Sequence, residues 1–162
     1  MKELIDGLFV GGERDCFDDE RQGWSVVHAC KSPCHQRAVG YRGRLPSKHP
    51  NYLTFRRDSH LYLNMIDPDQ PLFMPPLFLE SIEFIAEQLS QCKVLIHCNQ
   101  GLSRAPSLAL LYLAGIGRIA GSDFEIARAE FRRVHPEYAP GLGIAAYLRA
   151  HWRELMASVP EA

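Results

Sequence analysis

The segment with the clearest chemical potential is a cysteine followed by an arginine, with five residues between them. Its sequence is VLIHCNQGLSR, residues 94–104. A short apolar strand brings Cys98 into a loop, and the loop ends at Arg104, where an apolar helix begins. Backbone amides in such a loop can point inward together and bind an anion, reinforced by the helix N-terminus behind them. Gly101 permits the backbone angles that this loop needs.

The same loop can also activate the thiol. The planar guanidinium of Arg104 can bind two oxygens of a phosphate group. Its positive field would stabilise a thiolate at Cys98 and so lower the pKa of that thiol. A buried structural cysteine is the alternative, and the position of Cys98 before a glycine-containing loop and an arginine-led helix weighs against it. The candidate phosphate-binding residues are Asn99, Gln100, Gly101, Leu102, Ser103 and Arg104.

The elements around this loop read as a mixed α/β pattern. Apolar runs predict strands at 8–10, 24–29, 61–64 and 93–97. Helical periodicity predicts helices from 75, over 104–116, after an N-cap at Ser122, and from 141. A short helix is expected over 15–22, and a long loop over 39–58. Because helices and strands alternate, we expect a central, mostly parallel sheet with helices on both faces.

Composition limits the class of protein. The chain has 162 residues, of which 46% are hydrophobic and 23% charged, and we expect one globular domain over residues 1–162. Its formal charge of −1 does not favour a general nucleic-acid binder, although a local basic patch stays open. No apolar run approaches the roughly 18 residues of a membrane span. The N-terminus turns polar too soon for a signal peptide, so a cytoplasmic protein with free thiols is expected.

The pattern His97-Cys98 to Arg104, continued as Ser-Arg-Ala-Pro, resembles the signature of the cysteine-dependent protein tyrosine phosphatase superfamily. It is most similar to the small dual-specificity branch, strongly over 61–113 and more weakly over 4–27. The resemblance implies a phosphatase-like fold and a phosphocysteine formed on Cys98. In that mechanism Arg104 and the loop amides stabilise the phosphoryl oxygens. Ser103 assists departure of the thiolate, and His97 orients the loop and helps to keep the thiol ionised.

The resemblance also implies a general acid that protonates the leaving oxygen. The family places an aspartate on a loop after a strand, ahead of the helix that precedes the nucleophile strand. Here that loop reads Asn-Met-Ile-Asp-Pro-Asp over 64–69. Asp67 is the main candidate and Asp69 the alternate, and a turn without catalytic role is the remaining possibility. The Trp-Pro-Asp form of the larger tyrosine-specific enzymes is absent, as it is in the dual-specificity branch.

A second group of cysteines and histidines stands close together, at His28, Cys30, Cys34 and His35. Structural zinc patterns usually separate their ligand pairs more widely, so we assign no metal and no cofactor here. The predicted strand at 24–29 ends just before Cys30. In some members of the superfamily a cysteine at the end of a strand in this position forms a reversible disulfide with the nucleophile. Cys30 is the candidate redox partner of Cys98 and Cys34 the second, with a purely structural cysteine favoured over either.

The expected function is hydrolysis of phosphotyrosine in proteins, with phosphoserine and phosphothreonine open, because the chain lacks room for the loops of a deep tyrosine-only cleft. One alternative is a non-catalytic phosphate-binding module, which the presence of Cys98, Arg104 and Asp67 disfavours. A phosphatase for a small-molecule or nucleic-acid phosphomonoester is another. Phosphoinositides are disfavoured by an uncharged loop, and a rhodanese-type enzyme would leave Asp67 and Ser103 without a role.

The expected partner is a phosphorylated protein or peptide, with no nucleic acid and no membrane, and a monomer is the default. The loop over 39–58 is rich in basic residues, which are most often only a solvated surface. The functional alternative is a flap that recruits an acidic or phosphorylated partner. The arginines concerned are Arg42, Arg44, Arg56 and Arg57.

Overall fold

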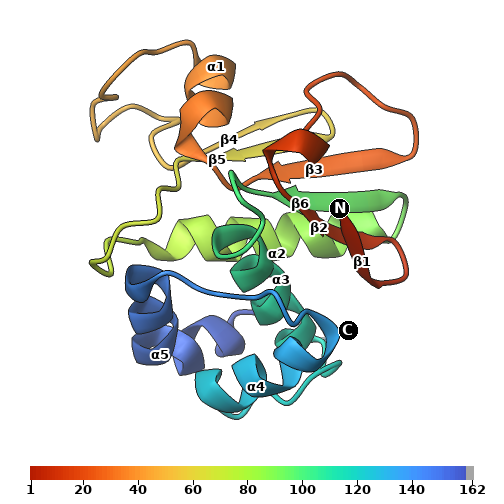
Figure 1. The fold of residues 1–162 in the computed structure, drawn as a ribbon. Helices are drawn as coiled ribbons and strands as arrows, with labels where there is room; N and C mark the ends of the chain where they lie inside the picture. The colour runs from red at the N-terminus through yellow and green to blue at the C-terminus, as the bar shows by residue number, and fades with distance from the viewer. Residues whose placement is uncertain (160–162) are drawn as a thin grey trace.

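The computed structural model describes residues 1–159 and has a six-stranded sheet at its centre (Figure 1). The strand order is β1 (Lys2–Ile5), β2 (Leu8–Gly11), β6 (Lys93–His97), β3 (Trp24–His28), β5 (His60–Leu63) and β4 (Thr54–Arg57). The inner strands β2, β6, β3 and β5 run parallel, and the edge strands β1 and β4 pair antiparallel. The predicted mostly parallel sheet is therefore confirmed.

Four longer helices lie on one side of the sheet: α2 (Pro75–Leu89), α3 (Arg104–Gly115), α4 (Phe124–Val134) and α5 (Leu142–Ala157). The first two contact strands, and α4 and α5 pack against α3 from the side away from the sheet. Because α3 lies between the sheet and these helices, residues 104–114 are all buried. This placement explains why its sequence is apolar all round. No helix within residues 1–159 is both long and apolar enough to cross a bilayer.

The opposite face of the sheet has a thinner cover. It consists of two short helical turns, η1 (Glu13–Asp15) and η2 (Lys31–His35), the short helix α1 (Gln36–Val39), and the loops beside them. Phe17 packs there against Val26 of β3 and Leu95 of β6. Helical elements thus cover both faces, as predicted, but with unequal depth.

Three local predictions were wrong. No helix forms over 15–22, because the chain leaves η1 in an extended loop whose Phe17 is held by the sheet. The segment 39–58 was expected to be a loop, but it contains strand β4. This edge strand buries few side chains, so its sequence lacks the alternating apolar pattern that indicates a strand. The N-cap of α4 is Asp123 rather than Ser122, since the Asp123 carboxylate accepts a hydrogen bond from the Ile126 amide at 2.9 Å.

Candidate active site

The loop over 98–103 joins the C-terminal end of β6 to the first residue of α3. Backbone hydrogen bonds hold it from both neighbouring strands. The Cys98 amide donates to the Gly11 carbonyl at 3.3 Å, and the Glu13 amide donates to the Asn99 carbonyl at 3.1 Å. On the other side, the Ala29 amide donates to the His97 carbonyl at 2.8 Å. The loop is therefore fixed by the ends of β2 and β3 as well as by its own strand.

The Cys98 side chain is 2% exposed and lies inside the curve of this loop. The Gly101 amide donates to Cys98 Sγ at 3.3 Å. Gly101 has a φ of 76°, and a Cβ at this position would lie 2.9 Å from the Gly11 carbonyl carbon and oxygen. A glycine is therefore required both by the backbone angle and by the close approach of β2. The sulfur receives an N–H dipole and lies at the N-terminal end of α3, which favours an anion.

Arg104 connects the nucleophile loop to the chain just before Asp67. Its Nη1 donates to the Met65 carbonyl at 2.9 Å, and its Nη2 donates to Asn99 Oδ1 at 2.6 Å. The side chain is 9% exposed, and its Nε has no hydrogen-bond partner among residues 1–159. A buried N–H without a partner is costly, and an incoming oxyanion would satisfy it.

The Ser103 hydroxyl is oriented by the segment before α5. Its Oγ accepts a hydrogen bond from the Gly141 amide at 2.9 Å, which leaves the O–H free to donate. Ser103 occupies the N-cap position of α3, but its side chain makes no capping hydrogen bond. The hydroxyl is thus not used to stabilise its own helix.

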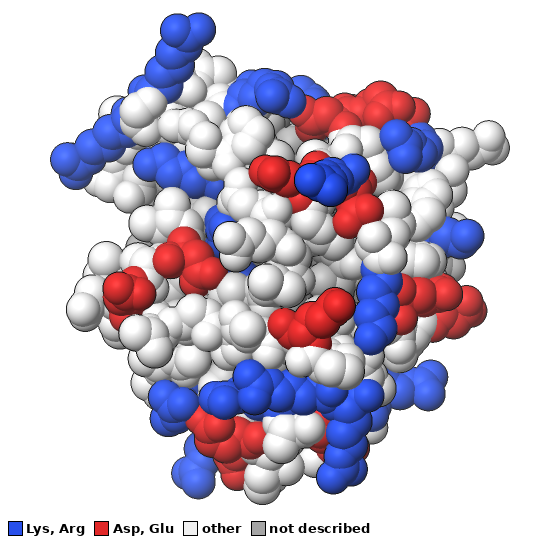
Figure 2. Space-filling model, viewed as in Figure 1, with Lys and Arg blue, Asp and Glu red and all other residues white. Residues whose placement is uncertain are grey.

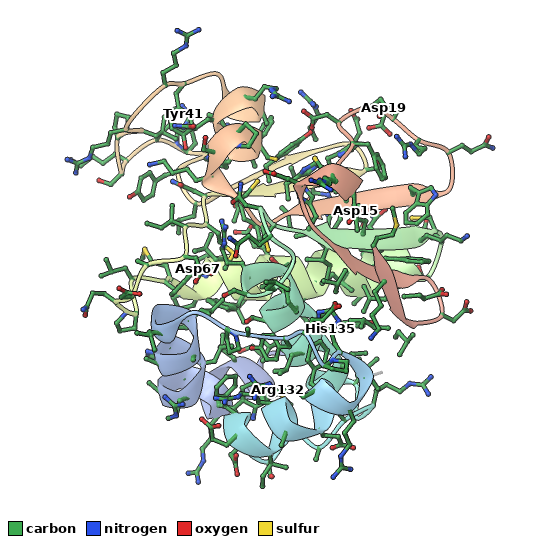
Figure 3. The ribbon with its side chains drawn as sticks, in the orientation of Figure 1. Asp15, Asp19, Tyr41, Asp67, Arg132 and His135 are labelled. Carbon is green, nitrogen blue, oxygen red and sulfur yellow. The ribbon has the colours of Figure 1, made fainter. Side chains whose placement is uncertain are left out.

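The loop that carries Asp67 packs against the same segment. A Cβ on Gly141 would collide with the Asp67 carboxylate, and one on Gly143 would collide with the carbonyls of Pro68 and Gln70. Asp67 is exposed and lies above the first turn of α5 (Figure 3). Its carboxylate therefore lies beside the residue whose amide holds Ser103. Asp69 is exposed as well, and the contact of Asp67 with Gly141 favours Asp67 as the residue nearer the nucleophile loop.

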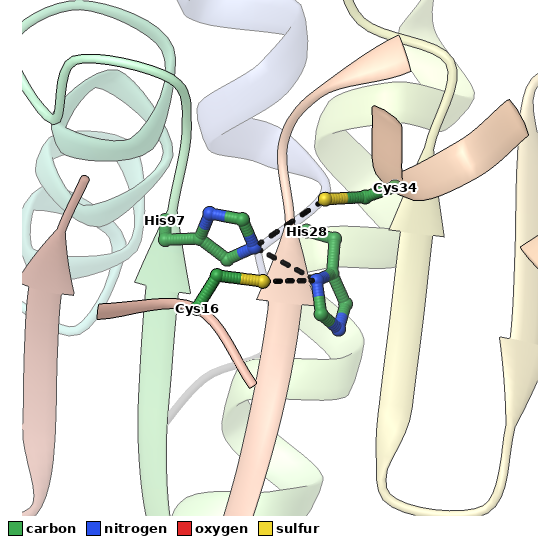
Figure 4. A group of neighbouring side chains, drawn as sticks. All are labelled: Cys16, His28, Cys34 and His97. Carbon is green, nitrogen blue, oxygen red and sulfur yellow. Dashed lines mark hydrogen bonds between the residues drawn. The ribbon is translucent and has the colours of Figure 1, made fainter. Parts of the chain in front are cut away.

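The His97 side chain belongs to a buried cluster with Cys16, His28 and Cys34 at the end of β6 (Figure 4). Its Nε2 lies 2.7 Å from His28 Nδ1, and its Nδ1 has no hydrogen-bond partner within residues 1–159. Burial alone would lower the pKa of His97, but the neighbouring Cys16 thiol raises it above the usual value. Burial lowers the pKa of His28. The His97 carbonyl holds the loop through the Ala29 amide, and the imidazole faces His28. The role of His97 in orienting the loop and keeping the Cys98 thiol ionised stays a prediction.

Of the four residues that sequence proximity had grouped, His28 and Cys34 stay together in this cluster, whereas His35 and Cys30 lie outside it. His35 bonds instead to the Tyr41 hydroxyl at 2.9 Å and the Asn51 carbonyl at 3.0 Å. Cys30 has Cys34 as its thiol neighbour, and this hydrogen bond lowers the pKa of Cys30 to about 7 although burial opposes it. A disulfide between Cys30 and Cys98 stays a prediction. Sequence reasoning missed Cys16 as a neighbour, whereas the pairing of His28 with His97 could follow from their equivalent places at the ends of adjacent parallel strands.

No family profile matches the chain. The sequence is 24% identical over 138 residues to dual specificity protein phosphatase 9 of Homo sapiens, covering 84% of this chain. The chain spans only 33% of the length of that relative.

Solved structures share the fold. DUSP15 has a TM-score of 0.66 at 18% identity, covering 98% of this chain and 94% of that one. Human DUSP28 has a TM-score of 0.61 at 17% identity, covering 94% and 93%. The human tyrosine phosphatase-like serine/threonine/tyrosine-interacting protein has a TM-score of 0.59 at 19% identity, covering 94% and 95%. In both sequence and fold, the chain is therefore similar to the dual-specificity branch of the cysteine-dependent protein tyrosine phosphatase superfamily.

Proposed function

We propose that the protein is a phosphoprotein phosphatase that hydrolyses phosphomonoesters through a phosphocysteine on Cys98. The observation that carries this proposal is the arrangement around one sulfur. The Gly101 amide donates to Cys98 Sγ, and the N-terminal turn of α3 and a buried arginine lie at the same loop. These groups stabilise a thiolate and also the oxygens of a phosphoryl group. The similarity to dual-specificity phosphatases supports the same chemistry.

In the first step the Cys98 thiolate attacks phosphorus, and the bond to the leaving oxygen breaks. The Arg104 guanidinium and the loop amides bind the three non-bridging oxygens, whose charge is spread in the transition state. Arg104 would exchange its present hydrogen bond to Asn99 for bonds to the phosphoryl group. Asp67 donates its proton to the leaving oxygen, so that a neutral alcohol departs.

In the second step a water molecule attacks phosphorus and the sulfur–phosphorus bond breaks. The Asp67 carboxylate, now deprotonated, accepts a proton from that water. The Ser103 hydroxyl donates a hydrogen bond to the departing thiolate and keeps its proton, and the Gly141 amide holds the Ser103 oxygen in place. The products are inorganic phosphate and the original thiolate, and the residues return to their starting protonation states.

A groove beside the loop of Asp67 favours a peptide substrate. It has a volume of ≈ 240 Å³ and combines an apolar floor with two basic side chains. Its lining includes Lys31, Arg44, Tyr52, Leu53, Ile66 and Leu72. Exposed basic residues also project from the loop after α1, namely Arg42, Arg44 and Lys48 (Figure 2). We infer that this side of the site binds acidic residues next to the phosphorylated residue.

Two arginines of the predicted basic flap have other partners. Arg56 makes a bidentate pair with Glu87, at 2.8 and 2.7 Å. Arg57 donates to the Tyr62 hydroxyl at 3.0 Å. Both belong to β4 and face its neighbours, so the proposed recognition surface is restricted to the loop that precedes the strand.

The test is hydrolysis of para-nitrophenyl phosphate in EDTA, comparing the wild type with Cys98→Ser from acidic to neutral pH. Acid quenching during turnover, followed by peptide mass mapping, would locate the phosphoryl group. Wild-type activity with phosphate on Cys98, and loss of both in the variant, is the expected result. A folded but silent wild type that binds phosphotyrosine would instead support a non-catalytic phosphate-binding module.

A further inference from the structure

Next to the nucleophile loop, four side chains from distant parts of the sequence bring sulfur and imidazole nitrogen atoms close together (Figure 4). These atoms are possible metal ligands. The residues are Cys16, His28, Cys34 and His97, and their ligand atoms all lie within 4.8 Å of one another. The loop after η1, the end of β3, the turn η2 and the end of β6 each supply one of them. All are buried except Cys16, which is half-buried. The cluster is therefore a closed, mostly dry site with four donors.

The spacing of these atoms is close to that of a tetrahedral zinc site. Bond lengths of about 2.3 Å to sulfur and about 2.0 Å to nitrogen place a sulfur and a nitrogen ligand about 3.5 Å apart at a tetrahedral angle. The observed separations are 3.7 Å between Cys16 Sγ and His28 Nδ1, and 3.9 Å between Cys34 Sγ and His97 Nε2. The two imidazole nitrogens, at 2.7 Å, would have to move apart to about 3.3 Å. An outward shift of the two rings by less than about 1 Å would bring this pair to the tetrahedral spacing.

The outer contacts of His28 match those of a metal-binding histidine. Its Nε2 lies 3.0 Å from His60 Nδ1, and His60 Nε2 lies 3.6 Å from a Glu20 carboxylate oxygen. A histidine that binds a metal through one nitrogen usually donates its other N–H to a carboxylate or another acceptor. Donation from Nε2 to His60 leaves the Nδ1 lone pair of His28 facing the centre of the cluster.

The donor set also selects the ion. Two thiolates and two neutral imidazoles suit Zn²⁺, and four protein ligands leave no open position for a reacting molecule. Binding releases the two thiol protons, and the two thiolate charges then balance the charge of the ion. The filled site is neutral, which is the condition under which a buried ion is tolerated.

We propose that this cluster binds a structural Zn²⁺ that stabilises the position of the nucleophile loop. The ligands are Cys16, His28, Cys34 and His97. His97 immediately precedes Cys98, so its bond to the metal would connect the loop to β3, to η2 and to the segment after η1. The ion has no role in the chemistry at Cys98. This proposal goes beyond the phosphatase activity and does not depend on it.

The test measures metal binding in a Cys98→Ser background, which removes the nucleophile thiol as a competing ligand. Protein purified without added metal or chelator is analysed for zinc, and about one ion per chain is expected. Replacement of the zinc by Co²⁺ should give thiolate charge-transfer absorption in the near ultraviolet and the visible bands of a tetrahedral ion. Both signals should be lost in Cys16→Ser and in Cys34→Ser.

Two matched controls separate the cluster from general thiol binding. Cys92→Ser should retain the metal, because the Cys92 thiol lies beside Ser25 Oγ at 3.2 Å and outside the cluster. Cys30→Ser should also retain it, although Cys30 is the thiol neighbour of Cys34. Loss of the Co²⁺ bands in either control would reject the assigned ligand set.

The proposal is overturned if the folded protein contains no zinc and gives no tetrahedral Co²⁺ spectrum. It is also overturned if the bands survive in both Cys16→Ser and Cys34→Ser. Should either variant fail to fold, the parent protein provides a second measurement. Zinc should slow alkylation of Cys16 and Cys34, as mapped by mass spectrometry, and leave the rate at Cys92 unchanged. Equal rates with and without Zn²⁺ would reject the site.

Discussion

His97 connects two different thiol environments, because its imidazole lies with Cys16 and Cys34 and the next residue is Cys98. Cys98 lies in a loop of amide N–H groups at a helix N-terminus, next to a guanidinium. Cys16 and Cys34 lie among imidazole nitrogens. The first set of partners consists of hydrogen-bond donors and attracts an anion. The second set offers lone pairs and attracts a cation. A cysteine side chain is thus suited to nucleophilic attack at position 98 and to metal binding at positions 16 and 34.

The difference between the two environments arises from what surrounds each sulfur, not from its distance along the chain. His97 takes part in both, since its carbonyl accepts from the Ala29 amide in the loop framework and its imidazole faces His28. Substitutions that act on one environment only can therefore show whether the two are functionally independent.

The largest expected effect is a double dissociation between Cys98→Ser and Cys34→Ser. Cys98→Ser should lower kcat by at least about 10³-fold and change the free energy of unfolding by less than about 0.5 kcal/mol. Cys34→Ser should retain measurable turnover but lose about 2 kcal/mol of stability through the lost ligand. Initial rates and urea unfolding of both variants measure these effects. An equal loss of activity in the two variants would show that the two thiol environments are not functionally independent.

Asp67→Asn should have the next largest effect, because it removes the proposed proton donor. We expect kcat on a phosphoserine peptide to fall about 10²-fold to 10³-fold, and kcat on para-nitrophenyl phosphate to fall much less. The nitrophenolate is a good leaving group and needs little protonation. Asp69→Asn is the matched control and should change neither rate by much. The reverse ranking of the two variants would transfer the acid role to Asp69.

Gly101→Ala tests the backbone cradle of Cys98. The added Cβ would meet the Gly11 carbonyl at 2.9 Å while the residue holds a φ of 76°, so β2 or the loop must move. A displacement of about 1 Å at a reacting group costs on the order of 10²-fold in kcat. Gly117→Ala is the control, since Gly117 also has a positive φ of 69° but nothing within 4 Å of its Cβ position.

Comparable losses of kcat in Gly101→Ala and Gly117→Ala would show that general destabilisation by a substitution at positive φ, and not the close approach to Gly11, is responsible. Zinc content should be unchanged in both variants, because neither glycine contacts the Cys16 and Cys34 cluster. Loss of zinc in Gly101→Ala would indicate that the two thiol environments are mechanically coupled.

His35 provides a pH-dependent test beside the cluster. Burial lowers the pKa of His35 from 6.5 to about 4. The unfolded chain therefore binds a proton between these pH values that the folded chain does not, and stability falls as the pH decreases through this window. We expect the wild type to lose about 2 kcal/mol more than His35→Gln between pH 6.5 and pH 4. Parallel pH profiles of unfolding would remove His35 as the cause.

The smallest expected effect concerns recognition beside Cys98. Arg44→Glu should raise KM for an acidic phosphopeptide about fivefold, which corresponds to about 1 kcal/mol, and leave para-nitrophenyl phosphate unaffected. Arg42→Glu is the control, because Arg42 is equally exposed but does not line the groove. A fall in peptide affinity of the same size in both variants would indicate general charge attraction and not a groove.

Sequence periodicity predicted the inner strands and the longer helices, because each of these buries a regular set of side chains. It failed where burial is slight or irregular. The edge strand β4 carries Arg56 and Arg57, and the segment 15–22 owes its path to Phe17 packing on the sheet. Neither feature produces a regular repeat of apolar residues in the local sequence.

Local sequence predicted the strand, loop and helix that carry Cys98, Gly101, Ser103 and Arg104, because these elements follow one another directly in the chain. Hydrogen bonds from β2 and β3 also hold the loop. Tertiary structure alone decided which partners the other groups meet. Gly141 approaches Asp67 and Ser103 only because α5 returns to the loop. His97 and His28 face each other because β6 and β3 pair in parallel with these residues in register, and Cys16 and Cys34 reach them from loops on one face of the sheet. Contacts between residues so far apart depend on strand pairing and packing, for which the sequence holds no local signal.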